Sequence, residues 1–206
     1  MSVITISREL GSDGDKIAEM LCESLGYCKV GKEMVMQIAE EAGVDVDAIH
    51  AMEASFVTRA RLVSGEMTSL YRKQATAFEK RGAVDDQTYA KVVRETLEDY
   101  ARQGNALIVG RGGQMILKDF PGVLHVRLFA AEDIRAQRIA EREGVSAREA
   151  LQMVQQSDEQ KRQYIRHMFS NADWRNSKYY HLVIDTGHIP PDTAANIISI
   201  ASTGVV

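Results

Sequence analysis

The sequence predicts an α/β fold of three layers, in which a parallel β-sheet is covered by helices on both faces. Short apolar runs alternate with longer segments of helical periodicity, which is the pattern of a parallel sheet with crossover helices. Several of these runs end in polar or glycine-rich sequence. The strand predicted at the start of the chain and the strand predicted at residues 106–109 are separated by about ninety mostly helical residues. This is far more than a normal crossover needs and indicates a helical insertion.

The first strand and the first helix frame a glycine-containing turn. The β-branched run at residues 3–6 predicts a strand, and Gly11 and Gly14 lie in the turn that follows. Apolar residues then repeat at helical spacing from Ile17, and Gly26 stands where a C-terminal cap belongs. Strand, glycine turn and helix is an order that binds phosphate, because free N–H groups at a helix start point at the anion. An ordinary tight turn is the alternative.

The middle of the chain is mostly helical. Residues 27–30 are a short strand or a turn, and a second helix is expected at 32–42. The pattern at 47–80 is helical but mixes polar and apolar residues. Apolar positions between residues 89 and 101 mark one face of a long helix that Gly104 ends.

The second half of the chain continues the alternation. Further strands are predicted at residues 106–109, 123–129 and 182–184. Helices are predicted from Glu132, from a Ser146-x-x-Glu149 capping box that leads toward Phe169, and from Asp192 or Thr193.

Composition narrows the class of protein. The net charge of −4 over 206 residues argues against bulk nucleic-acid binding, which relies on a basic surface. No apolar run approaches the roughly 18 residues of a membrane span, so no membrane association is expected. Two cysteines without framework or metal-ligand spacing indicate a reducing compartment, and we expect a cytoplasmic protein. The sequence is compatible with a homo-oligomer.

Polar residues follow three of the predicted strands. They are Ser7-Arg8-Glu9, Gly110-Arg111-Gly112-Gly113 and Asp185-Thr186-Gly187. Because ligands of parallel sheets bind at the carboxyl ends of the strands, we expect the three groups to face one crevice. An arginine between glycines, such as Arg111, offers a guanidinium fork for a phosphate or carboxylate.

Arginines also gather in the helices after the strand at 123–129. Arg135, Arg138 and Arg142 share one helix face, and Asp158 and Arg162 are spaced to pair. A solvated, salt-bridged face is the alternative. Together with the turn and Arg111, however, these cations fit phosphoryl transfer, which depends on positioning and charge stabilisation.

The order of segments resembles the cytidylate kinases and, more closely, their cytidylate kinase-like relatives. The resemblance is carried by residues 4–14, 108–113, 120–130, 135–138, 158–162 and 182–187. It implies a P-loop kinase fold with a core at 1–31 and 104–206, a monophosphate-binding insertion at 32–103 and a lid at about 139–165.

The resemblance also implies roles for individual residues. The phosphates of ATP, with Mg²⁺, would be held by Gly11, Ser12, Asp13, Gly14, Asp15 and Lys16. The small-molecule nucleotide acceptor would be bound by Arg8, Gly110, Arg111, Asp158 and Asp185. The catalytic cations would be Lys16, Arg135, Arg138 and Arg162, with Arg162 steadied by Asp158.

The chain departs from the family pattern at three positions. Gly14 stands where the phosphate loop has its lysine, so either Lys16 or Arg8 would have to supply the cation. The hydroxyl that holds Mg²⁺ is missing, which leaves Asp15, Ser12 or water and phosphate oxygens. Gly112 replaces an acidic residue that would help to read the acceptor.

The expected function is therefore ATP-dependent phosphorylation of a nucleoside monophosphate, most simply a cytidylate-like one. The missing lysine keeps a second hypothesis open, a non-catalytic nucleotide sensor. A third is an interaction module that uses the helical insertion.

Overall fold

The strands form a single parallel sheet in the described part of the chain. The computed structural model describes residues 2–45, 47, 49, 87–170 and 172–205. In these residues five strands are ordered β2-β3-β1-β4-β5, and every neighbouring pair is parallel. The strands are β1 (Val3–Arg8), β2 (Cys28–Val30), β3 (Ala106–Val109), β4 (Val123–Phe129) and β5 (Leu182–Asp185). The predicted three-layer α/β class is confirmed.

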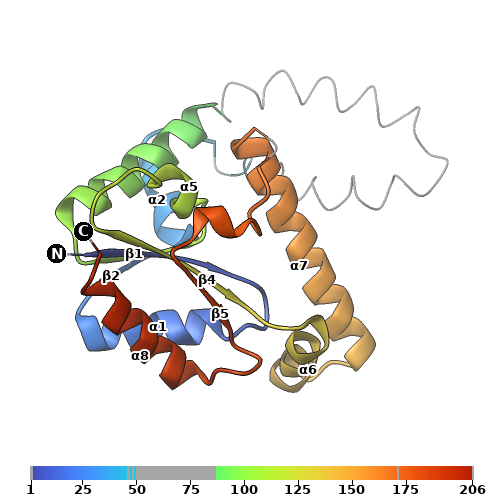
Figure 1. Ribbon diagram of the computed structural model, residues 1–206. Coiled ribbons are helices and arrows are strands. Elements are labelled where there is room, and N and C mark those ends of the chain that lie inside the picture. Colours follow the sequence, from blue (N-terminus) through green and yellow to red (C-terminus); the bar gives the residue numbers. More distant parts are fainter. Residues whose placement is uncertain (1, 46, 48, 50–86, 171, 206) are drawn as a thin grey trace, which may run out of the picture.

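Helices cover both faces of the sheet (Figure 1). One face carries α1 (Gly14–Leu25) and α8 (Pro191–Ser202). The other carries α2 (Lys32–Glu41), α5 (Gly113–Ile116) and an unlabelled helix at 87–103. The helices α6 (Glu132–Glu143) and α7 (Ala147–Met168) lie beyond the carboxyl ends of the strands, and the short helix η1 (Ser177–Tyr179) precedes β5.

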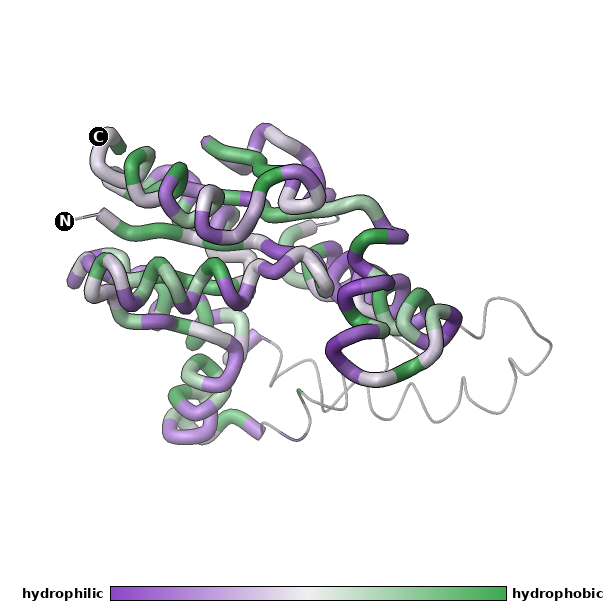
Figure 2. Tube along the Cα trace, turned by 90° about the horizontal axis from the view of Figure 1, so that it is seen from below, coloured by the Kyte–Doolittle hydropathy of each residue, from purple (hydrophilic) through white to green (hydrophobic). Residues whose placement is uncertain are grey.

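Each face of the sheet has its own apolar core. Ile17 and Leu21 of α1 are fully buried with Ile4 of the sheet, while Tyr89 and Leu97 are fully buried on the opposite face. Figure 2 shows the strands as mostly hydrophobic and the helices as alternating between hydrophobic and hydrophilic positions. Within the described residues, no helix combines the length and the apolar character needed to cross a membrane.

Most predicted boundaries are close to the observed ones. The Ser146 capping box is present, with the Ser146 hydroxyl and the Glu149 carboxylate each binding the other residue's backbone N–H, and α7 is one continuous helix. Gly26 caps α1 with φ 66°. Helix α8 starts at Pro191, one residue before the predicted Asp192, because proline fits the first helical position. The prediction for 47–80 lies outside the described residues except at positions 47 and 49.

Candidate functional site

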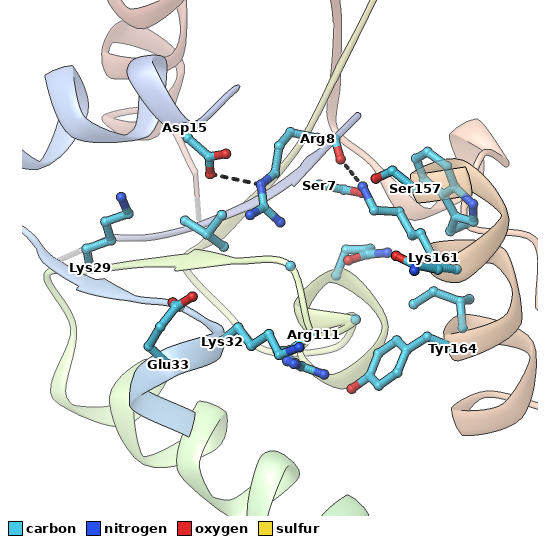
Figure 3. A pocket seen from close by; sticks show the side chains of 18 of the residues that line it. Ser7, Arg8, Asp15, Lys29, Lys32, Glu33, Arg111, Ser157, Lys161 and Tyr164 are labelled. Atoms are coloured by element: carbon cyan, nitrogen blue, oxygen red, sulfur yellow. Dashed lines mark hydrogen bonds and ion pairs between the residues drawn. The ribbon is translucent and has the colours of Figure 1, made fainter. Parts of the chain in front are cut away.

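A cleft of about 810 Å³ lies at the carboxyl ends of β1 and β3, beneath the inner face of α7. We call it the main cleft. Figure 3 shows its charged side chains coming from four places in the chain: the end of β1 and start of α1, the corner between β2 and α2, the turn after β3, and α7. The predicted meeting of strand ends is confirmed for β1 and β3.

Arg8 crosses the position where a phosphate loop would have its lysine. A Cβ atom on Gly14 would lie 2.3 Å from Cβ of Arg8 and 2.6 Å from its Cγ, so only glycine leaves room for this side chain. The Arg8 Nε donates to Oδ1 of Asp15 at 3.0 Å. A Cβ on Gly110 would lie 3.1 Å from Nη1 of Arg8, which places the guanidinium between the start of α1 and the turn after β3.

The remaining residues of the predicted phosphate loop lie around the start of α1. Gly11 has φ 80°, and a Cβ there would lie 2.6 Å from the Arg135 carbonyl oxygen. Ser12 is fully buried and donates its hydroxyl to the Glu9 carbonyl at 2.7 Å. Because α1 begins at Gly14, the N–H groups of its first turn have no acceptor within the helix.

The structure separates the two candidates for the missing loop cation. Lys16 is exposed on α1 and is absent from the described residues that line the main cleft. Arg8 lines that cleft beside Asp15, the only member of the predicted loop that does so among the described lining residues. Geometry therefore favours Arg8 over Lys16.

Arg111 faces Arg8 from the other side of the main cleft (Figure 3). It has φ 53° in the Gly-Arg-Gly-Gly turn, a left-handed conformation that is uncommon outside glycine. Its guanidinium carbon lies 5.1 Å from the ring centroid of Tyr164 and 5.9 Å from that of Tyr89. These cation–π contacts hold the guanidinium at the cleft wall.

Gly112 explains why no acidic residue follows Arg111. Gly112 has φ 70°, and a Cβ atom there would lie 2.3 Å from the ring of Phe169. The ring occupies the space that any side chain at position 112 would need. This position of the turn is therefore closed to a carboxylate.

Lys161 extends from α7 into the main cleft. Its Nζ donates to the Arg8 carbonyl oxygen and lies 4.6 Å from the ring centroid of Trp174. Burial, and next the nearby Arg8 charge, lower the pKa of Lys161 to about 7. Sequence reasoning did not select this lysine. The signal was present, because Lys161 precedes the buried Tyr164 and Ile165 by three and four residues, and thus shares their helix face.

The predicted pairing of Asp158 with Arg162 is wrong. Arg162 binds Glu159 at 2.5 Å and lines a second cleft of about 510 Å³ outside the main one. Asp158 lines this second cleft as well, but it binds Arg135 at 2.9 Å and Arg175 at 2.8 Å. Arg135 and Arg175 bind the carboxylate together, and each comes from another segment of the chain.

Arg135 belongs to a buried ion network that joins the sheet to α6 and α7. Its side chain is 4 % exposed. The guanidinium contacts Glu9 at 3.3 Å as well as Asp158, and it donates to the carbonyls of Leu10 and Ala130. Glu9 also binds Arg127 at 3.1 Å. Arg135 was predicted as a catalytic cation, yet its donors are directed at protein groups.

The other two arginines on α6 are also engaged by the protein. Arg138 contacts Asp13 and donates to the carbonyls of Gly11 at 3.2 Å and Thr186 at 2.8 Å. Arg142 is exposed and binds the neighbouring Glu143. The structure therefore does not bring these arginines into the main cleft.

Asp185 does not join the site that its strand end predicted. Strand β4 separates β5 from β1, and Asp185 is absent from the described lining of the main cleft. Its carboxylate accepts from the Gly187 N–H at 2.9 Å and contacts His188 Nδ1 at 3.1 Å. The expectation of one crevice shared by three strand ends is wrong at this residue, because sheet order places it on the far side of β1.

The described residues offer a limited donor set for Mg²⁺. They contain no cluster of three histidine, cysteine, aspartate or glutamate side chains. The Asp15 carboxylate lies in the main cleft, whereas the Ser12 hydroxyl is committed to Glu9. Mg²⁺ at phosphate sites commonly takes one or two carboxylates together with phosphate oxygens and water, so Asp15 fits this role and Ser12 does not.

Comparisons with known proteins agree with the fold and point to one family. Residues 3–188 match the model of the cytidylate kinase-like family. A cytidylate kinase from Pyrococcus horikoshii is 24% identical over 200 residues, covering 97% of this chain and 87% of its own. A cytidylate kinase from Ignicoccus hospitalis is 26% identical over 199 residues, covering 96% and 97% respectively.

Two solved structures are similar over nearly their whole length. An uncharacterized protein from Eubacterium ventriosum superposes with a TM-score of 0.69 at 22% identity, and 99% of each chain is covered. TT1252 from Thermus thermophilus gives a TM-score of 0.51 at 17% identity, covering 98% of this chain and 97% of its own. At these identities the likeness concerns the fold.

Proposed function

This chain belongs to the cytidylate kinase-like family, and on that premise we propose that it is an ATP-dependent phosphotransferase whose acceptor is a nucleoside monophosphate, cytidylate or a close analogue. The observation that carries the proposal is the pair of arginines, Arg8 and Arg111, that face each other across the main cleft. One stands at the start of α1 and the other after β3. Such a pair suits two phosphate groups brought together for transfer.

The donor phosphates would lie at the start of α1. The free N–H groups of the first helical turn and the helix dipole attract anions there. Arg8 supplies the positive charge that Gly14 lacks. Asp15 would hold Mg²⁺ together with phosphate oxygens, and the metal would neutralise charge on the donor phosphates.

The acceptor phosphate would bind Arg111. A phosphate oxygen of the acceptor then attacks the terminal phosphorus of ATP, and the bond to the ADP oxygen breaks. Negative charge spreads over the oxygens of the transferred group, which would lie between Arg8 and Arg111. The two guanidinium groups are held in place before the reaction by Asp15 on one side and by Tyr164 on the other, so little reorganisation is needed.

The proposal includes the division of the chain. Residues 1–31 and 104–206 would form the phosphate-binding core, 32–103 the insertion that binds the acceptor, and about 139–165 the lid. Lys32 and Glu33 line the main cleft at the start of the insertion, which supports acceptor contacts from that side. We also propose a cytoplasmic location, where ATP and nucleotides are available.

A non-catalytic nucleotide sensor is the second candidate. The observation that favours it is Gly14, which removes the lysine usual at that position of a phosphate loop. The sensor would bind ATP without forming ADP.

Steady-state assays of ADP formation test the first proposal. The chain is incubated with ATP and Mg²⁺ and with each of CMP, dCMP, UMP, AMP and GMP in turn. We expect ADP above the ATP-only background with a pyrimidine acceptor. No acceptor-dependent ADP with any of the five, in a sample that ATP stabilises against heat, would support the sensor instead.

A further inference from the structure

Lys161 is a cation in the main cleft that has no carboxylate partner among the described residues. No ion pair within 4.0 Å joins it to another described residue, and the donor contact that it makes is to the Arg8 carbonyl. A lysine ammonium has three donors, so further donors are available to a ligand. Positive charges taken out of water are normally paired, and this one instead lies next to another cation, Arg8.

The position of Lys161 is fixed from behind by Trp174. That ring is 1% exposed. Arg127 and Arg175 lie over the same ring, at 5.3 Å and 5.2 Å from its centroid. The ring cannot retreat without breaking these contacts, so the ammonium is held toward the cleft. Figure 3 shows it on the side of Arg8 that faces α7.

We propose that Lys161 is a phosphate-binding catalytic residue: when a nucleotide enters, its ammonium leaves the Arg8 carbonyl and donates to a phosphate oxygen held between Lys161 and Arg8. This inference rests on the proposed function, because it assigns a further cation to the same transfer site. An arginine at this position would be charged at every physiological pH, whereas the charge of a lysine here depends on pH.

The charge state of Lys161 depends on groups from several elements. Burial lowers its pKa to about 7, and the positive charge of Arg8 acts in the same direction. Three carboxylates, Asp158, Glu9 and Asp15, raise it by smaller amounts. Arg111 stands across the cleft, and Arg127 and Arg175 stand behind Trp174.

The arrival of a phosphate changes this balance. A bound anion next to the ammonium favours the charged form, so the pKa of Lys161 rises on binding. A lysine that is half protonated at pH 7 can gain up to about half a proton per site. The protein would thus couple nucleotide binding to proton uptake.

Isothermal titration calorimetry measures this uptake. Inorganic tripolyphosphate and ADP are each titrated into the full chain at pH 7, in PIPES and in imidazole, whose ionisation heats differ. The dependence of the observed heat on the buffer gives the number of protons exchanged. Protons exchanged by the ligand itself are common to all variants, so the difference between the wild type and Lys161→Arg isolates the lysine.

We expect the wild type to take up more protons than Lys161→Arg by up to about 0.5 per site. Lys161→Met, which keeps the stem over Trp174 but has no charge, should bind tripolyphosphate at least tenfold more weakly and show the same reduced uptake. The exposed Lys118, paired with Asp119 outside the cleft, provides a matched control, and Lys118→Arg should leave both quantities unchanged.

The outcomes separate this inference from the proposed function. Tripolyphosphate binding by Lys161→Met as tight as that of the wild type overturns the role of Lys161 and leaves the kinase proposal intact. Lysine-dependent uptake without ADP formation supports Lys161 as a phosphate ligand and contradicts the kinase. If neither tripolyphosphate nor ADP binds, both the role of Lys161 and the kinase proposal are overturned.

Discussion

Exchanging the residues at positions 8 and 14 should move the loop cation back to its usual place. In this chain an arginine occupies the position of a loop glycine, and a glycine occupies the position of the loop lysine. The structure makes the two substitutions dependent on each other, because the Arg8 arm fills the space above Gly14. We therefore predict that Arg8→Gly and Gly14→Lys each abolish most activity, whereas the double variant recovers it.

The expected magnitudes follow from the contacts. Arg8→Gly removes a preorganised charged donor, and losses of this kind cost about 10²–10³ in kcat. Gly14→Lys places a Cβ 2.3 Å from the Arg8 Cβ, so the arginine arm must leave its position, and the loss should be of similar size. In the double variant the clash is absent and a cation is present. Activity should then lie within about tenfold of the wild type, which is strongly non-additive.

The assay is the rate of ADP formation with the best acceptor at saturating ATP. Circular dichroism and Tm establish that each variant is folded, and Lys16→Ala serves as a control because Lys16 lies outside the described cleft lining. The reasoning is refuted if the folded double variant is no more active than Arg8→Gly. It is equally refuted if Lys16→Ala, rather than Arg8→Gly, removes the activity.

Three further predictions concern stability. Burial, and secondly the charge of a neighbouring histidine, lower the pKa of His125 from 6.5 to about 4. Its contribution to stability is thus complete above pH 6.5 and is lost as the pH falls toward 4. Urea unfolding should show a loss of about 2–3 kcal/mol between pH 7.5 and 4.5 that His125→Gln reduces; an equal loss in the variant would contradict this. Glu9→Gln should cost about 3–5 kcal/mol in the same measurement, because it leaves buried arginines unpaired. Glu143→Gln, at an exposed pair, should cost under about 1 kcal/mol, and similar costs at both sites would exclude a special role for the network. Gly112→Ala and Gly144→Ala have nearly the same positive φ, but only the first Cβ meets a ring, at 2.3 Å. Gly112→Ala should therefore lower Tm clearly more than its control, and equal shifts would mean that backbone conformation alone sets the cost.

Much of the fold could be predicted from local sequence. The strands at 106–109 and 123–129 have the predicted bounds, because buried parallel strands are continuous apolar runs that glycine and proline interrupt. Ser146 and Glu149 marked the start of α7 through a reciprocal capping pattern that depends on four residues only. Sheet order was less accessible, because it depends on which strands meet through long connections.

The candidate site was predictable where a strand end determines it. Arg8 and Arg111 follow directly from the ends of β1 and β3. The choice of Arg8 over Lys16 needed the structure, because it depends on the Arg8 side chain filling the space above Gly14. The partner of Asp158 also could not be read from helical spacing, since Arg175 reaches it from a loop seventeen residues away.

The two attachments of α7 to the end of β1 have a mechanical consequence. Arg8 accepts a hydrogen bond from Lys161, and the adjacent Glu9 is linked through Arg135 to Asp158, one helical turn earlier. Because α7 is attached at two neighbouring residues, it cannot rotate about one attachment without straining the other. A phosphate that draws Lys161 away from the Arg8 carbonyl removes one of these two attachments. The protein without ligand would then be stiffer at this joint, and the arriving phosphate would itself loosen it.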